Sequence, residues 1–333
     1  MFDDYISQLQ EGNNLSQQQA ESVLAKILDN ESISETKIAD FLTLMTEKGA
    51  TTDEILGFID AMQMRMNKVN APANSIDVCG TGGDKSNSFN ISTASAIVLA
   101  GGGVNVAKHG NRSASSKCGS ADVLEELGIP IDLDQSLAEN YLAKQGFVFL
   151  FAQKYHPALK RLAIVRKQLA FPTVFNLLGP LLNPAGVKRQ VIGTFSEQNA
   201  NIIAEVVSRR NYEKAIILTS RDGLDEASLE APTLIIEIEQ DTARQYEIEP
   251  KDLGIEPVAN SEFVGGEANV NAQIIKDALS SNGKDTKAQI IALNAGIGFF
   301  VAGKTSSIQA GYKLALKVIE SGKARTKLEE LSR

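Results

Sequence analysis

The stretch GTGGDKSNSFNIST, residues 80–93, lies between a short apolar run at 75–79 and a helix-like run at 94–100. The order is therefore strand, glycine-rich loop and helix start. Three glycines let the backbone turn tightly and approach a ligand closely. Asn90, Ser92 and Thr93 fall where the first turn of a helix leaves backbone N–H groups unpaired, which favours an anion and most often phosphate. Glycines also serve structural turns, and the spacing matches neither the P-loop nor the Rossmann pattern, so both interpretations stay open for the stretch alone.

Short β-rich runs alternate with helical runs through the middle of the chain. The expected strands are residues 76–79, 104–107, 147–152, 191–195 and 215–219. The expected helices between them are residues 93–100, 121–127, 158–169 and 199–209. This alternation predicts an α/β fold with a mostly parallel sheet and helices on its faces. A β-hairpin is expected at 233–249, and helices return at 270–279, 287–301 and 307–320.

The first 70 residues carry only helical patterns. Three helices are expected, at 16–28, from Ser34 to Gly49, and from Thr51 onward. Ser16 with Gln19, and Thr51 with Glu54, have the spacing of capping boxes. Three short helices bury little by themselves, so they must pack on the rest of the chain. Residues 70–74, Asn-Ala-Pro-Ala-Asn, have the composition of a linker.

Composition bounds the function. The chain has 333 residues, 43% of them hydrophobic, and a net charge of −8. This is enough for a large core, and it lacks the basic balance typical of proteins that bind duplex nucleic acid. The two cysteines form no CxxC pair, the N-terminus has no signal-peptide pattern, and the longest apolar stretch, 288–302, is shorter than the ~20 residues of a membrane helix. We therefore expect a soluble, cytoplasmic protein with no nucleic-acid or membrane partner.

A second polar loop, KHGNRSASSKCGS at 108–120, follows the expected strand 104–107. Ligands of open α/β sheets bind beyond the carboxyl ends of the strands. Lys108, Arg112 and Lys117 place three cations within ten residues, beside several serines. The loop suits a polyphosphate, the alternative being a solvated polar loop. His109 is one of only two histidines, and its position makes substrate contact plausible without assigning it proton transfer.

Two further patterns suggest ligands. Asp225 and Glu226 follow the expected strand 215–219. Alone they would be an acidic surface turn, but near a phosphate site they suggest Mg²⁺, which prefers a few carboxylates, waters and phosphate oxygens. Arg166 lies near the end of an amphipathic helix and before FNLLGPLLNP at 175–184. It has the geometry to pair with a carboxylate, although an exposed helix arginine is the simpler interpretation.

Together, GTGGD…NIST, KHGNRSASS, VRKQL…FNLLGPLLNP and DGLDE, in this order, resemble the anthranilate phosphoribosyltransferase family over the whole chain. The resemblance implies a small N-terminal helical domain, 1–70, that dimerises and forms one wall of a cleft. It also implies a large α/β catalytic domain, 75–333, with a mostly parallel sheet, similar to nucleoside phosphorylases and phosphoribosyltransferases. The expected reaction transfers phosphoribose from 5-phospho-α-D-ribose 1-diphosphate (phosphoribosyl diphosphate) to the amine of anthranilate, in tryptophan biosynthesis, by a homodimer.

The family's site residues carry over onto matching positions. The resemblance implies that Ser92, Asp225 and Glu226 hold magnesium, with two Mg²⁺ ions per active site, and that Gly80, Asn111 and Arg166 contact anthranilate. The residues implied to bind phosphoribosyl diphosphate are Gly80, Gly83, Asp84, Ser88, Asn90, Ile91, Ser92, Thr93, Lys108, His109, Gly110, Asn111, Arg112, Ser113, Ala114, Ser115, Ser116 and Ser120.

The chain departs from the family pattern at Lys85 and Ala170, where many relatives have glycine. Two alternative functions remain to be weighed. A pyrimidine nucleoside phosphorylase of the same fold would need no paired acidic metal ligands. A non-catalytic nucleic-acid-binding relative would be expected to have a basic patch and to have lost those ligands.

Overall fold

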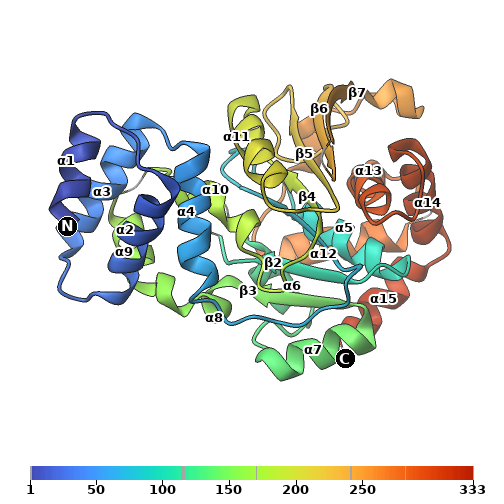
Figure 1. Cartoon of the computed structure of the whole chain (residues 1–333). Coiled ribbons are helices and arrows are strands. Elements are labelled where there is room, and N and C mark those ends of the chain that lie inside the picture. The colour runs from blue at the N-terminus through green and yellow to red at the C-terminus, as the bar shows by residue number, and fades with distance from the viewer. Residues whose placement is uncertain (1, 114–116, 170, 241, 282, 333) are drawn as a thin grey trace.

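The structure is a computed structural model that describes residues 2–113, 117–169, 171–240, 242–281 and 283–332. It has a smaller helical part, which contains the N-terminus, and a larger α/β part (Figure 1). The expected fold class is confirmed. Among the described residues, none of the helices combines the length and apolar character needed to cross a bilayer.

The N-terminal helices begin and end where their capping residues place them. They are α1 (Phe2–Gln10), α2 (Gln17–Asp29), α3 (Glu35–Lys48) and α4 (Thr52–Gln63). Ser16 with Gln19 and Thr51 with Glu54 form the expected capping boxes. Helix α1 was not among the three expected helices. Its residues Phe2, Tyr5, Ile6 and Leu9 follow helical spacing, but only Leu9 is buried and the others pack partly buried against the core.

A second segment completes the helical part. It contains α8 (Ala152–Tyr155), the 3₁₀ turn Pro157–Leu159, α9 (Lys160–Leu169), α10 (Phe175–Leu178) and the 3₁₀ turn Gly179–Leu182. Helix α9 packs on α3, and Phe175 of α10 stacks on Phe58 of α4 with ring centroids 6.1 Å apart. The helical part therefore consists of two segments that are distant in sequence.

Seven strands form the sheet of the larger part, in the order β3-β2-β1-β4-β5-β6-β7. The first five run parallel, and β6 and β7 form the expected antiparallel hairpin. The strands are β1 (Ile76–Gly80), β2 (Val106–Gly110), β3 (Phe147–Phe151), β4 (Arg189–Gly193), β5 (Lys214–Ser220), β6 (Thr233–Glu239) and β7 (Thr242–Ile248). The order reverses between β1 and β4, the position at which open α/β sheets bind ligands.

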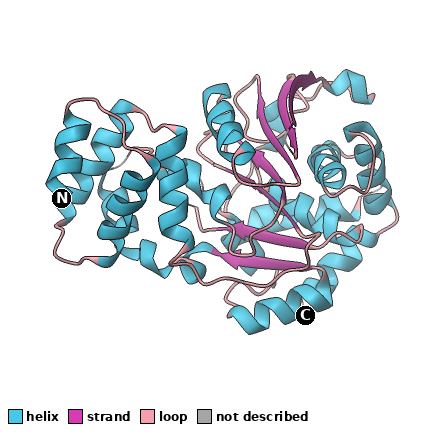
Figure 2. Cartoon of the chain, in the orientation of Figure 1, coloured by secondary structure: helices cyan, strands magenta, loops and turns pink. Residues whose placement is uncertain are grey.

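Helices cover both faces of this sheet (Figure 2). They are α5 (Ile91–Gly101), α6 (Ser120–Glu126), α7 (Gln135–Gln145), α11 (Glu197–Ser208), α12 (Ala268–Ser280), α13 (Thr286–Val301), α14 (Ile308–Glu320) and α15 (Lys323–Leu331), with 3₁₀ turns at Pro250–Leu253 and Asn260–Phe263. Side chains alternate along β5: Ile216 and Leu218 pack with α5 and the C-terminal helices, whereas Ile217 packs with α11. The same apolar cluster that holds Ile217 continues into the helical part, so the two parts share one core.

The expected strand 104–107 was misplaced. Strand β2 extends to Gly110, so Lys108 and His109 are buried inside a strand and do not belong to the following loop. Polar residues favour a loop interpretation, but here partners in the neighbouring strands accommodate them. Helix α7 was not expected, because it buries only Ala138 and Leu142 and shows little periodicity.

Candidate active site

The loops that follow β1, β2 and β5 meet at one edge of the sheet and border a cavity of about 640 Å³. Nearly all residues singled out in the sequence line it: Gly80, Gly83, Asp84, Ser88, Asn90, Ser92, Thr93, Lys108, His109, Gly110, Asn111, Arg112, Ser113, Ser120, Arg166, Asp225 and Glu226. Ile91 does not line the cavity and is fully buried in the core. Ala114, Ser115 and Ser116, like Ala170, lie outside the described residues.

The glycine loop turns with an unusual number of left-handed residues. Gly82 and Gly83 have φ of +64° and +87°, and Lys85 and Asn87 have φ of +61° and +55°. Lys85 therefore occupies a conformation that glycine adopts more easily. The loop exposes backbone N–H groups, one of which, Gly82 N, donates to Asp225 Oδ2 at 2.9 Å. The glycine loop and the acidic loop are thus in direct contact.

Three carboxylates converge beside this contact. One oxygen each from Asp84, Asp225 and Glu226 lies within 4.8 Å of the others. Burial, reinforced by Asp84, raises the pKa of Asp225 to about 6, and burial together with Asp225 raises the pKa of Glu226 well above its usual value. Within the described chain, Asp84 Oδ2 and Glu226 Oε2 are buried without a hydrogen-bond partner. Crowded, partly unsatisfied carboxylates fit a hard divalent cation, and the residues present therefore suit Mg²⁺.

Asp84 was predicted to contact the phosphorylated substrate, and its place in the carboxylate cluster was missed. The signal was available in the sequence, since Asp84 is the only acidic residue of the glycine loop. The contact itself depends on the sheet order. Strand β1 lies next to β4, with Gly80 opposite Gly193, and a Cβ at Gly193 would lie 1.6 Å from the backbone oxygen of Asp225. Only glycine at that position lets the acidic loop fold against the strand ends.

Lys108 supplies a positive charge from below these loops. Its Nζ donates to Val78 O at 2.6 Å and to Ser92 Oγ at 3.3 Å, and the side chain is 1% exposed. Burial lowers its pKa, while Asp77, Glu226 and Asp225 act in the opposite direction. The hydrogen bonds of Lys108 therefore join β1 to the first turn of α5.

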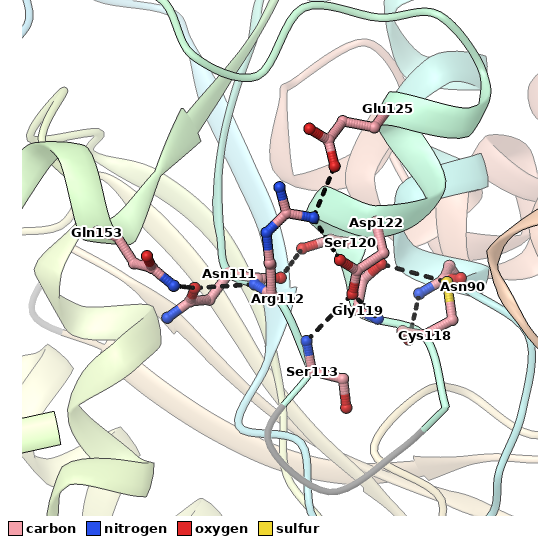
Figure 3. Close-up of polar contacts among 10 residues, drawn as sticks. All are labelled: Asn90, Asn111, Arg112, Ser113, Cys118, Gly119, Ser120, Asp122, Glu125 and Gln153. Atoms are coloured by element: carbon pink, nitrogen blue, oxygen red, sulfur yellow. Dashed lines mark hydrogen bonds and ion pairs between the residues drawn. The ribbon is translucent and has the colours of Figure 1, made fainter. Parts of the chain in front are cut away.

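Two carboxylates of α6 form ion pairs with Arg112 at the base of the second loop (Figure 3). Arg112 Nη1 donates to Asp122 Oδ1 and Glu125 Oε2, both at 2.6 Å. Asp122 Oδ2 accepts from Gly119 N at 2.9 Å, and Ser120 Oγ donates to Asn111 O at 3.2 Å. The carboxylates of Glu125 and Asp122 raise the pKa of Arg112. Counting the loop's cations from sequence overstates its positive charge, because Arg112 is already neutralised.

The two histidines lie together at another wall of the cavity. Nδ1 of His109 donates to Gly179 O at 3.0 Å, and Nε2 of His156 donates to Leu182 O at 2.9 Å. Their rings meet edge to face, 5.2 Å apart. Burial lowers the pKa of His109 to about 3 and that of His156 to about 4. Both are neutral near pH 7, and His156, which no local motif marks, was missed in the sequence.

Arg166 lies on α9, where the helical part borders the cavity. Its Nη2 donates to Asn176 Oδ1 at 3.0 Å, and its guanidinium lies 5.6 Å from the centre of the Phe175 ring. Across the described ranges it makes no ion pair, and burial lowers its pKa. A half-buried cation without a counter-charge is suited to an anionic ligand. A carboxylate fits best, because its two oxygens can accept two parallel hydrogen bonds from the guanidinium.

A helical bundle joined to an α/β domain, with a glycine loop and an acidic cluster at the switch in strand order, is the architecture of a glycosyl transferase. The sequence profile of the glycosyl transferase family α/β domain matches residues 72–325, and that of its helical bundle domain matches residues 3–66.

Curated relatives and solved structures narrow this class to one family. The chain is 42% identical to the anthranilate phosphoribosyltransferases of Rubrobacter xylanophilus and Chloroherpeton thalassium, with alignments covering 97% of this chain and 94% and 95% of those proteins. The Thermus thermophilus enzyme aligns with a TM-score of 0.91 at 35% identity, covering 98% of both chains. The Saccharomyces cerevisiae enzyme, solved with phosphoribosyl diphosphate and Mg, aligns with a TM-score of 0.89 at 27% identity, covering 99% of this chain and 96% of that one. The chain therefore belongs to the anthranilate phosphoribosyltransferase family.

Proposed function

We propose that this protein transfers the phosphoribosyl group of phosphoribosyl diphosphate to the amine of anthranilate, giving N-(5-phosphoribosyl)anthranilate and diphosphate, in tryptophan biosynthesis. The observation that carries the proposal is one cavity with two kinds of ligand site. The glycine loop and the carboxylate cluster suit a magnesium diphosphate, and Arg166 suits a carboxylate. The relatives carry the name anthranilate phosphoribosyltransferase, and the Saccharomyces cerevisiae enzyme has been solved with phosphoribosyl diphosphate and Mg and also with 4-fluoroanthranilate.

The donor is assigned to the two loops that follow β1 and β2. The backbone N–H groups of the glycine loop and the first turn of α5 would receive the phosphates, with Lys108 beneath them. The proposed donor-binding residues are Gly80, Gly83, Asp84, Ser88, Asn90, Ser92, Thr93, Lys108, His109, Gly110, Asn111, Arg112, Ser113 and Ser120. Ile91 would support this set from the core, and Ala114, Ser115 and Ser116 remain proposals from sequence alone.

The metal is assigned to Asp225, Glu226 and Ser92, with Asp84 added by the structure. A bound Mg²⁺ neutralises the charge that builds on the departing diphosphate. We propose two ions per active site, as the resemblance to the family implies.

The acceptor is assigned to Gly80, Asn111 and Arg166, with Arg166 facing the carboxylate of anthranilate. The bond between C1 of ribose and the diphosphate oxygen breaks with its electrons on oxygen, and the amine nitrogen forms the new bond to C1 and releases a proton. The amine is already a nucleophile, so catalysis rests on placing the two substrates, worth ~7–11 kcal/mol in favourable cases. The neutral histidines agree with a site that needs no strong base.

Three larger features belong to the same proposal. We divide the chain into a helical domain, 1–70, and a catalytic domain, 75–333, whose segment 152–182 packs on the helical domain. We propose that closure about the 70–74 linker excludes water. We propose a homodimer formed through the helical domain. We also propose a cytoplasmic location, supported by two cysteines, both within the described residues, that remain thiols.

The test is loss of anthranilate fluorescence in the presence of phosphoribosyl diphosphate, with and without Mg²⁺. We expect turnover only with the metal. Thymidine phosphorolysis by the same preparation would favour a nucleoside phosphorylase, which the carboxylate cluster and Arg166 argue against. A gel shift of nucleic acid at moderate salt would favour a binding protein, which the net charge of −8 argues against.

A further inference from the structure

Asn271 lies in the first turn of α12 and outside every loop discussed above. This polar residue is only 2% exposed. It does not line the cavity. Its Nδ2 donates to Asn90 Oδ1 at 3.0 Å, and its Oδ1 accepts from Gly266 N at 2.7 Å. A buried amide with both ends engaged fixes the groups that it contacts.

The first of these groups is the side chain of Asn90, which precedes α5 and lines the cavity. Because Asn271 donates to Asn90 Oδ1, the amide of Asn90 presents Nδ2 on its other side. That Nδ2 donates to Cys118 O at 3.2 Å, at the base of the second loop (Figure 3). A reversed Asn90 amide would place two donors against each other and two acceptors against each other. Asn271 therefore decides the orientation of Asn90 and, through it, the joint between the two loops.

The second group is the turn at 263–266, which pairs with the backbone of the glycine loop. Phe89 N donates to Phe263 O at 2.9 Å, and Gly265 N donates to Asn87 O at 2.8 Å. Packing here leaves no space, since a Cβ at Gly265 would lie 2.5 Å from Asn271 Oδ1 and 2.8 Å from Phe89 Cα. The Asn271 side chain thus contacts both the 263–266 turn, which packs on the glycine loop, and Asn90, near the end of that loop.

We propose that Asn271 is a positioning residue for donor binding: it acts through Asn90 to hold the glycine loop and the second loop in the arrangement that receives the diphosphate. The inference rests on the proposed function, because it takes the loops as the donor site. Asn271 itself does not contact the substrate. Its removal leaves Asn90 Oδ1 and Gly266 N without these partners, so that the bond to Cys118 O alone holds the Asn90 side chain.

The test compares the dissociation constant of phosphoribosyl diphosphate, measured by titration calorimetry in Mg²⁺, for wild type and variants. We expect Asn271→Ala to raise this constant about tenfold, the cost typical of leaving a buried hydrogen-bonding group unpaired, with the KM for anthranilate unchanged. Asn271→Asp keeps the acceptor for Gly266 N and removes the donor to Asn90, so it should also weaken donor binding. Asn269→Asp is the matched control, because it makes the same change at an exposed position two residues earlier in α12.

A double-mutant cycle separates positioning from general stability. If Asn271 acts through Asn90, then Asn271→Ala has little further effect on donor affinity in an Asn90→Ala background. Additive effects, an unchanged dissociation constant, or an equal rise in the KM for anthranilate would overturn the inference. If Asn271→Ala fails to fold, the nearly isosteric Asn271→Asp carries the same comparison. Failure of the wild type to bind phosphoribosyl diphosphate would instead contradict the proposed function.

Discussion

At the scale of single residues, burial raises the pKa values of Asp225 and Glu226 in the acidic cluster. Asp225 and Glu226 are held against β1 and β4, away from the water that would solvate their charges. Carboxylates in such a place need a cation to balance them. Lys108 contributes one charge from below, and the three acids leave an excess of negative charge facing the cavity.

The first prediction concerns this excess. Asp225→Ala and Glu226→Ala should each lower turnover on the order of 10²-fold or more at limiting Mg²⁺, because the departing diphosphate loses its stabilising charge. Steady-state rates across a Mg²⁺ titration measure the effect. Asp252→Ala, on an exposed turn, is the control. A rate unchanged from wild type would refute the metal assignment.

A second prediction concerns Arg166, whose removal should affect the binding of anthranilate alone. Arg166→Ala should raise the KM for anthranilate about tenfold or more and leave the KM for phosphoribosyl diphosphate nearly unchanged, because a charge-assisted pair with the carboxylate is lost. Lys167→Ala removes an exposed cation from the next position and should change neither constant. A normal anthranilate KM in Arg166→Ala would exclude the carboxylate role.

His109 and His156 predict a pH dependence of stability. Their folded pKa values, about 3 and about 4, lie below the unfolded value of 6.5. The unfolded chain therefore binds more protons below pH 6.5, and the stability that these residues contribute is lost as the pH falls from 6.5 toward 4. Each histidine adds a slope of up to about 1.4 kcal/mol per pH unit. Urea unfolding of His156→Gln between pH 7 and 5 should show a shallower loss than wild type, and equal slopes would contradict the burial argument.

At the scale of elements, Glu54 connects the helices of the N-terminal part. The side chain is fully buried in α4, where Oε1 accepts from Leu15 N at 2.8 Å and Oε2 accepts from Thr51 N at 2.7 Å. Lys48 Nζ, at the end of α3, lies 2.9 Å from Oε2. One carboxylate thus joins the α1–α2 connection, the start of α4 and the end of α3.

Glu54→Gln should therefore destabilise the protein by about 2–4 kcal/mol, because it breaks a buried ion pair and sets an amide N–H against a backbone N–H. Glu47→Gln makes the same change at an exposed position of α3 and should have little effect. Urea unfolding measures both. The prediction fails if the two variants are equally stable.

Elements with strong local signals could be predicted from the sequence, and those without could not. The capping residues Ser16 and Thr51 mark helix starts, and the alternation of β-rich and helical runs gives the parallel sheet. The end of β2 was misjudged, because Lys108 is polar but satisfied by Val78 O and Ser92 Oγ. Such partners come from other strands and helices, so no local pattern shows them.

The same division holds for the site. Motifs in the loops predicted the cavity-lining residues, because they follow the carboxyl ends of strands, where open α/β sheets bind ligands. His156, Asn271 and the closure of Arg112 by Asp122 and Glu125 depend on contacts across the fold. Which donors and acceptors meet is decided by the packing of distant elements, not by the residues next to them in sequence.

At the scale of the whole molecule, the cavity lies where the two parts of the fold meet. The sheet edge supplies the glycine and acidic loops, and α9 of the helical part supplies Arg166 (Figure 1). The apolar core that runs from the helical part to the sheet fixes this arrangement. We therefore propose that one cavity binds the donor at the sheet and the acceptor at the helices.

The most direct test is a crystal structure of the protein with Mg²⁺, diphosphate and anthranilate, a combination that does not react. We expect metal density about 2.1 Å from oxygens of Asp84, Asp225 or Glu226, with diphosphate over the glycine loop. We expect the carboxylate of anthranilate about 2.7–2.9 Å from the guanidinium of Arg166, in the same cavity. Anthranilate bound away from Arg166, or diphosphate bound away from the carboxylate cluster, would contradict a shared site.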